Sequence, residues 1–315
     1  MAPARTVLYH VSDLHFGYED RQALDWFAAE VAREQPAGVI CTGDLTMRGT
    51  AKEFALAAEW LAHLPVPVSI EPGNHDVPYY HMMLRRLARP YAHFHALKHR
   101  LGSEIALPEV AVVSLKTIAR AQLRLNWSKG RVSQSDLDAT LQGLSHHSVV
   151  PLKLVACHHP LVEADTHATA STRGGKRALA ALARHGVGAV LSGHVHDPFD
   201  KLVEIEGHRI RIVGAGTLSQ RLRSSRPSFN RLVLDGAGGG SDHRRDEPAA
   251  LPPPGGGWHS ADHGVAQPGS GRRRCPVPAD PAGAQRGDPA RRWRRLEPAD
   301  RPFLSASRRA AARPA

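Results

Sequence analysis

The chain has 315 residues, a formal net charge of +11, 20 histidines and three cysteines. This length can bury a substantial core in one large domain or two smaller ones. No segment approaches the roughly 20 apolar residues that cross a bilayer, and the N-terminus lacks the apolar centre of a secretion signal. Because Cys41, Cys157 and Cys275 are widely spaced and odd in number, the sequence indicates a reduced, cytoplasmic protein without a membrane segment.

Apolar runs alternate with amphipathic segments over the first 235 residues. The apolar runs predict strands over 6–12, 38–43, 66–73, 110–115, 152–157, 188–193, 201–207, 208–216 and 229–235. The amphipathic segments predict helices over 20–34, 50–64, 79–87, 133–144 and 173–185. Ser133 is the expected N-cap of the fourth helix, and Gly186 is the expected stop after the fifth. Such alternation is typical of an α/β domain whose sheets are covered by helices.

The runs 201–207 and 208–216 meet at Gly207 and His208, which predicts an antiparallel hairpin. The sheets are therefore expected to be mixed and not wholly parallel.

Residues 236–315 differ in composition from the rest. They contain 12 glycines, 12 prolines and 14 arginines, with no lysine and no periodic apolar pattern. Such a segment cannot bury enough apolar surface to offset its ordering entropy, so we expect a disordered tail after a domain formed by residues 1–235. The tail is either a natural basic extension or the product of a shifted reading frame that replaced one or two further strands. Its "RRWRR" motif also suits an anionic polymer such as nucleic acid.

Five short polar motifs each follow the end of an apolar run. They are "SDLH" with Asp13 and His15, "TGDLT" with Asp44, "PGNHD" with residues 74–76, "CHHP" with residues 158–159, and "SGHVH" with His194 and His196. Any one of them alone could be an ordinary polar turn. Loops at strand ends are where α/β proteins bind ligands, and this mixture of His, Asp and Asn suits borderline divalent ions such as Mn, Fe, Zn or Ni. The five together indicate two such ions.

The sequence resembles the calcineurin-like metallophosphoesterases, in particular the bacterial branch with class III cyclic-nucleotide phosphodiesterase-like proteins. The likeness rests on "DLHFG", "TGDLTMRGTAKEF", "PGNHDVP", "GRVSQSDL", "HHP", "SGHVH" and "GAGTLSQRLRSSRPSFN", and it covers residues 6 to 235. It implies a four-layer αββα sandwich of two mixed β-sheets flanked by helices. One departure is Lys116, where the family often has Asn.

The resemblance also implies a ligand set. Asp13, His15 and His196 would hold the first metal, Asn74, His158 and His194 the second, and Asp44 would bridge them. His159 is expected beside a ligand and not as one. The remaining histidines, among them His93, His95, His99, His146 and His147, are not expected to bind metal.

The implied reaction is hydrolysis of a phosphate ester by in-line attack of a metal-bridging hydroxide. His75 would stabilise the transition state or protonate the leaving oxygen, and Asp76 would either orient His75 or cap the turn. Arg221 and Arg223 are candidates for binding the substrate phosphate. We expect a phosphodiester in preference to a monoester; a monoester and a nucleotide pyrophosphate would use the same centre. The mildly basic folded part argues against a nuclease.

Overall fold

A computed structural model describes residues 5–78, 88–102, 105–118, 129–163, 166, 172–235 and 257–265. The chain divides into two compact units, Met1–Pro268 and Gly269–Ala315. All described residues belong to the first unit. The predicted helix over 79–87, Cys275, and residues 236–256 and 266–315 of the predicted tail lie outside the described residues.

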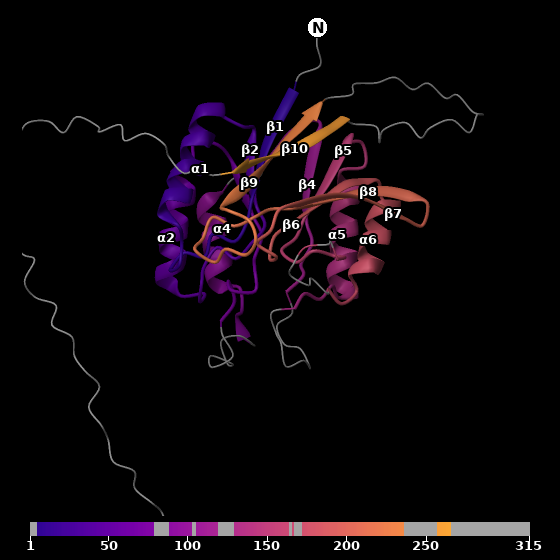
Figure 1. Cartoon of the computed structure of the whole chain (residues 1–315). Coiled ribbons are helices and arrows are strands. Elements are labelled where there is room, and N and C mark those ends of the chain that lie inside the picture. The colour runs from indigo at the N-terminus through magenta and orange to yellow at the C-terminus, as the bar shows by residue number, and fades with distance from the viewer. Residues whose placement is uncertain are drawn as a thin grey trace, which may run out of the picture. The chain divides into compact units, whose positions relative to one another are not determined.

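The strands form two five-stranded sheets (Figure 1). The first has the order β10-β9-β1-β2-β3, with β1 Arg5–Val11, β2 Gly38–Cys41, β3 Val68–Ile70, β9 Ser228–Asp235 and β10 Gly257–Val265. The second has the order β4-β5-β6-β8-β7, with β4 Val110–Ser114, β5 Leu152–Ala156, β6 Val187–Ser192, β7 Phe199–Ile205 and β8 His208–Gly214. In the first sheet β1, β2 and β3 run parallel, and β9 is antiparallel to both of its neighbours, β1 and β10. In the second sheet β4, β5, β6 and β8 run parallel, and β7 is antiparallel to β8. Mixed sheets are therefore confirmed.

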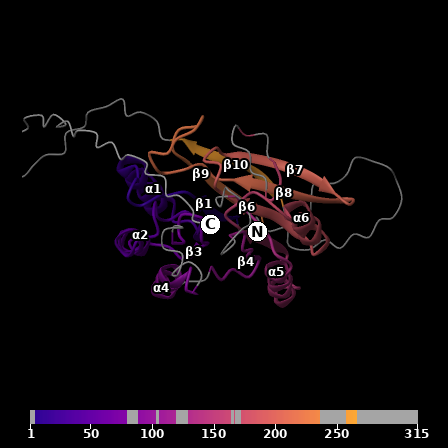
Figure 2. The ribbon, with the colours of Figure 1, turned by 90° about the horizontal axis from the view of Figure 1, so that it is seen from below.

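Helices cover the outer faces of both sheets. They are α1 Arg21–Glu34, α2 Ala51–Ala62, α4 Ala92–Leu101, α5 Gln134–His146 and α6 Gly175–Arg184. Figures 1 and 2 show α1, α2 and α4 on one side of the strands and α5 and α6 on the other. The predicted cap of α5 is present, because Ser133 Oγ accepts a hydrogen bond from the Asp136 N–H at 3.1 Å.

Three buried apolar clusters correspond to the boundaries between these layers. One joins the first sheet to α1, α2 and α4, and another joins the second sheet to α5 and α6. The third lies between the sheets, where Leu8 and Leu232 of the first meet Leu154 and Leu191 of the second. Helices, sheet, sheet and helices form four layers, so the predicted αββα sandwich is confirmed.

Two elements differ from the sequence prediction. Helix α4 was not expected, because only Phe94 and Leu97 are buried along it and no side chain caps its first residue. Strand β10 falls within the segment predicted to be disordered, yet it pairs antiparallel with β9, with an irregularity between His259 and Asp262. An unpaired edge of β9 would present free N–H and C=O groups, and β10 satisfies them.

The predicted hairpin is confirmed as β7 and β8. Its turn lies one residue earlier than expected, at Glu206 and Gly207, which both have positive φ, as a tight two-residue hairpin turn requires.

Candidate metal centre

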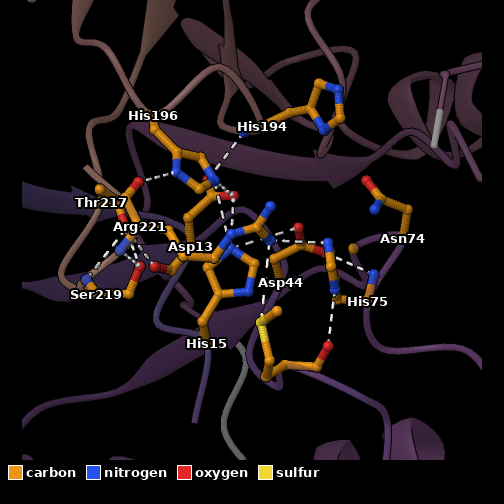
Figure 3. Close-up of polar contacts among 12 residues, drawn as sticks. Asp13, His15, Asp44, Asn74, His75, His194, His196, Thr217, Ser219 and Arg221 are labelled. Atoms are coloured by element: carbon orange, nitrogen blue, oxygen red, sulfur yellow. Dashed lines mark hydrogen bonds and ion pairs between the residues drawn. The ribbon is translucent and has the colours of Figure 1, made fainter. Parts of the chain in front are cut away.

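Every predicted ligand follows the carboxyl end of a strand in the structure. Asp13 and His15 follow β1, Asp44 follows β2, Asn74 follows β3, His158 follows β5, and His194 and His196 follow β6. Because β1, β2 and β3 run parallel, and β5 and β6 do too, their carboxyl ends meet at one edge of each sheet. This arrangement gathers ligands that are far apart in sequence into one site (Figure 3).

The backbone of this site is unusual. Five of the seven predicted ligands have left-handed φ angles: Asp13 58°, His15 46°, Asp44 51°, His194 70° and His196 61°. Each such residue costs about 1–3 kcal/mol, and such strain persists only where surrounding contacts impose it. The loops also approach one another closely, since a Cβ at Gly73 would lie 2.0 Å from Asp44 Oδ1 and one at Gly193 would lie 1.8 Å from Ser12 Oγ.

The first ligand cluster contains Asp13, His15 and His196. The Nε2 atoms of the two histidines are 3.3 Å apart, and Asp13 Oδ1 lies 3.0 Å from His196 Nε2 and 3.6 Å from His15 Nε2. His196 is oriented by its Nδ1, which lies 2.5 Å from the Arg221 carbonyl. Asp13 Oδ1 is buried and makes no well-formed hydrogen bond within the described part of the chain. Such an orphaned acceptor facing two imidazole nitrogens fits a metal ion.

The second cluster gathers around His158. Its Nε2 lies 3.1 Å from Asn74 Oδ1, and its Nδ1 is held 2.8 Å from the Thr42 carbonyl. Ring nitrogens of His158, His159 and His194 lie within 4.8 Å of one another. In Figure 3 the His194 ring points away from the first cluster, although its backbone N–H donates to Asp13 Oδ2 at 2.8 Å. The two histidines of "SGHVH" therefore face different clusters.

Asp44 lies between the two clusters. Its Oδ2 is 3.4 Å from His158 Nε2 and 3.8 Å from His15 Nε2. Its other oxygen, Oδ1, accepts a hydrogen bond from the His75 backbone N–H at 2.8 Å. One carboxylate oxygen thus faces both groups of imidazoles, as a bridging ligand does.

The electrostatics of the centre favour a cation. Burial favours the protonated acid, but the facing imidazoles hold the pKa of Asp13 and of Asp44 below the usual range. Burial likewise opposes protonation of His158, yet the Asp44 carboxylate raises the pKa of that imidazole to about 9. Burial lowers the pKa of His194 to about 3, which keeps its ring neutral, the form that binds metal. Two buried, ionised carboxylates surrounded by imidazoles fit divalent ions.

His75 and Arg221 lie beside this centre. His75 Nδ1 is 2.7 Å from the Met47 carbonyl, and His75 Nε2 is 2.9 Å from Arg221 Nη1 (Figure 3). Burial lowers the pKa of His75. Arg223, in contrast, is exposed, and among the described residues it makes no contact with the centre. The structure brings together one of the two predicted arginines with the predicted catalytic histidine.

Asp76 is buried beneath the loops and joins them. Its carboxylate accepts hydrogen bonds from the backbone N–H groups of Leu45, Thr46 and Gly73 at 2.8–3.1 Å, and from Thr46 Oγ1 at 2.9 Å. Burial and the nearby Asp44 charge raise the pKa of Asp76 to about 6. These contacts favour the turn-capping alternative for Asp76, because they tie the Asp44 loop to the Asn74 loop.

Residues 6–198 match the model of one protein family, the calcineurin-like phosphoesterases. The chain belongs to this family. The resemblance to this superfamily seen in the sequence is thereby confirmed, and the His and Asp clusters of the structure could hold the metal ions of the family. Within the part of the chain that the structure describes, no helix is long and apolar enough to span a bilayer.

Two relatives illustrate how far the likeness of this phosphoesterase extends. The glycerophosphodiester phosphodiesterase GpdQ of Enterobacter lignolyticus is 28% identical over 81 residues, which are 22% of this chain and 29% of that protein. A crystal structure of a dimetal phosphatase from Danio rerio matches 74% of this chain and 95% of its own, with a TM-score of 0.53 and 14% identity. At that identity the structural likeness concerns the fold.

Several residues that shape the candidate metal centre were not expected from the sequence. Thr117 Oγ1 lies 3.0 Å from His159 Nδ1, so the loop after β4 also reaches the second cluster. Asp197 Oδ1 accepts from the backbone N–H groups of Ser224 and Ser225, both at 3.1 Å, and thereby shapes the loop that carries Arg221. The only available signal for Asp197 was its position directly after His196. The carbonyls of Thr42 and Met47 left no signal, because every residue has a carbonyl.

Proposed function

We propose that this phosphoesterase hydrolyses phosphodiesters with two divalent ions held at the centre. The observation that carries the proposal is the position of Asp44 Oδ2, which faces His158 and His15 at 3.4 and 3.8 Å. A carboxylate shared in this way suits two ions at the spacing used for in-line displacement at phosphorus. The preference for a diester draws support from the phosphodiesterase among the relatives, in the region that matches.

In this proposal each cluster holds one ion. Asp13, His15 and His196 would hold the first, Asn74, His158 and His194 would hold the second, and Asp44 would contribute to both. The mixed nitrogen and oxygen donors suit Mn, Fe, Zn or Ni. When bound, such ions lower the pKa of water and stabilise the charge on phosphoryl oxygens.

Arg221 and His75 act on the substrate directly. The Met47 carbonyl can only accept, so Nδ1 of His75 carries the proton and Nε2 accepts from Arg221. A substrate phosphate would draw the guanidinium fork toward its own oxygens, because charged, bidentate hydrogen bonds are stronger than the bond to a neutral imidazole. His75 Nε2, released from Arg221, would then be free to take up a proton from solvent, and the resulting imidazolium could pass that proton to the leaving oxygen. Arg223 would contact only a more distant part of the ester.

Asp76 supports catalysis by positioning. Its carboxylate holds the backbone of the Asp44 and Asn74 loops and so sets the distance between the bridging ligand and a ligand of the second ion. Such partners of metal ligands typically affect metal affinity by ten- to a hundredfold.

The decisive experiment compares bis-p-nitrophenyl phosphate with p-nitrophenyl phosphate after metal reconstitution, with metal content measured for each variant. We expect a higher kcat/KM for the diester and two ions per chain. Asp44→Ala should lose both activity and metal, whereas Asp25→Ala, at an exposed position of α1, should lose neither. Full activity in Asp44→Ala would rule out the dinuclear mechanism. A higher kcat/KM for the monoester would mean that the substrate is a phosphomonoester and not a phosphodiester.

His75 is tested by varying the leaving group. In His75→Ala we expect a loss that grows as the leaving alcohol becomes more basic, because a poor leaving group needs the proton most. An equal loss for all leaving groups would instead assign His75 to stabilising the phosphoryl oxygens.

Two further expectations remain proposals. A cytoplasmic location accords with Cys41 and Cys157, which are free and buried thiols.

Binding of an anionic polymer through the basic tail predicts an affinity that falls steeply with salt and disappears on truncation after residue 268. Unchanged binding of single-stranded DNA after that truncation would reject the role of the tail.

A further inference from the structure

A cavity of about 590 Å³ is lined by none of the candidate ligands. It is formed by β3 and β4, the outermost strands of the two sheets, together with the C-terminal parts of α4 and α5. Figure 2 shows β3 and β4 facing each other between α4 and α5. Most of its lining is apolar, including Ile70, Leu101, Ile105 and Leu107.

One acidic side chain lines this cavity. Glu71 is only 4% exposed, and its Oε2 accepts a hydrogen bond from Ser114 Oγ. Burial raises the pKa of Glu71 to about 7, so near neutral pH a large fraction is the protonated acid, which can donate a hydrogen bond.

Besides the hydroxyls of Ser69 and Ser114, the cavity is lined by three basic side chains. Lys98 comes from the last turn of α4, and His146 and His147 come from the end of α5; all three line the cavity and are exposed. The nearby Lys98 charge lowers the pKa of Glu71, but burial dominates. An acid that can be neutral and three basic groups leave the lining complementary to negative charge.

We propose that this cavity is a second ligand site, which binds a small organic anion with an apolar body. The carboxylate or sulfonate of such a molecule would lie near Lys98 and the two histidines and would accept the Glu71 proton in a hydrogen bond. Its apolar body would cover the side chains of Ile105 and Leu107, and the volume is within the range of small-molecule sites. The site requires neither metal nor turnover at the centre.

The test uses 1-anilinonaphthalene-8-sulfonate, which combines an apolar body with one sulfonate. Its fluorescence is titrated with the full-length, metal-loaded protein, and we expect saturable binding of one probe per chain. Gly143→Phe should abolish binding, because Gly143 lines the cavity from α5 and the nearest heavy atom to a Cβ there, outside the helix, is Val113 Cγ1 at 3.1 Å. Circular dichroism and thermal unfolding check that this variant folds.

A second pair of variants tests the charge without filling space. Lys98→Met should weaken binding about tenfold, whereas Lys52→Met, at an exposed position of α2, should leave it unchanged. The proposal is overturned if the wild-type protein shows no saturable binding, if a folded Gly143→Phe binds like wild type, or if both lysine variants bind equally. Displacement of the probe by inorganic phosphate would also overturn it, because the probe would then occupy the metal centre.

Discussion

The metal centre and the cavity between β3 and β4 both bury acidic side chains, but the pKa of the carboxyl groups is lowered at the centre and raised in the cavity. At the centre, imidazoles face Asp13 and Asp44 and hold their pKa values low, so the carboxylates stay ionised. In the cavity Glu71 has a hydroxyl as its close partner, and burial raises the pKa of its carboxyl to about 7. Burial opposes ionisation in both places, and the partners decide the outcome. The carboxylates of the centre are therefore ionised, whereas a large fraction of Glu71 is the protonated acid near neutral pH.

The largest expected effect is that of metal removal on stability. Chelation should lower the free energy of unfolding by about 4 kcal/mol for each bound ion, relative to protein in metal at about a thousandfold above Kd, because the ions bind only the assembled site. Thermal unfolding with and without chelator measures the shift, and Asp44→Ala should show a much smaller one. An unchanged melting temperature in the wild-type protein would mean that the ligands do not hold metal.

The second effect concerns Glu71. The folded-state pKa of about 7 lies above the usual value of 4.5, so the folded protein binds the proton more tightly and loses stability as pH rises from about 4.5 through 7. The loss approaches about 3 kcal/mol above that range. Glu71→Gln removes the ionisation and should be more stable than wild type at pH 8.

Urea unfolding at pH 5 and pH 8 measures this difference. Glu59→Gln, at an exposed position of α2, serves as the control and should follow the wild-type pH dependence. The interpretation of Glu71 is wrong if Glu71→Gln follows it as well.

The third effect separates the two arginines of one loop. Arg221→Ala should reduce kcat/KM about thirtyfold, close to 2 kcal/mol, because a charged hydrogen-bond donor to the phosphate is lost. The Arg221 carbonyl that orients His196 is retained in this variant, so metal content should stay constant. Arg223→Ala should change kcat/KM by less than about twofold, because the side chain is exposed. Steady-state kinetics would contradict the assignment if the two variants were equally impaired.

The smallest effect sharpens the role of Asp76. Asp76→Asn keeps the size of the side chain but replaces one acceptor oxygen by a donor, so the loops that carry Asp44 and Asn74 lose part of their link. We expect metal affinity to fall about tenfold, with kcat largely restored at saturating metal. A kcat that stays low at saturating metal would give Asp76 a direct part in the reaction.

Much of the centre could be predicted from the sequence. The apolar runs marked the nine strands from β1 to β9, and the polar motifs directly after five of them supplied the residue types that bind metal. These features are local, because a strand pattern and the residues at its end are read from a few consecutive positions. Helix α4 was missed because its local pattern is weak: its buried face contains only Phe94 and Leu97.

The sequence by itself determined the family, the order of the strands along the chain and the chemical types of the ligands. The family resemblance implied that Asp44 lies between two clusters and that His194 and His196 serve different ones, whereas only the tertiary structure decided that the Met47 carbonyl meets His75. It also decided that β10 pairs with β9 and that Glu71 lines a cavity between two sheet edges. These features depend on backbone carbonyls, left-handed φ angles and spaces between distant strands, and such properties leave no mark in the residue types of a short segment.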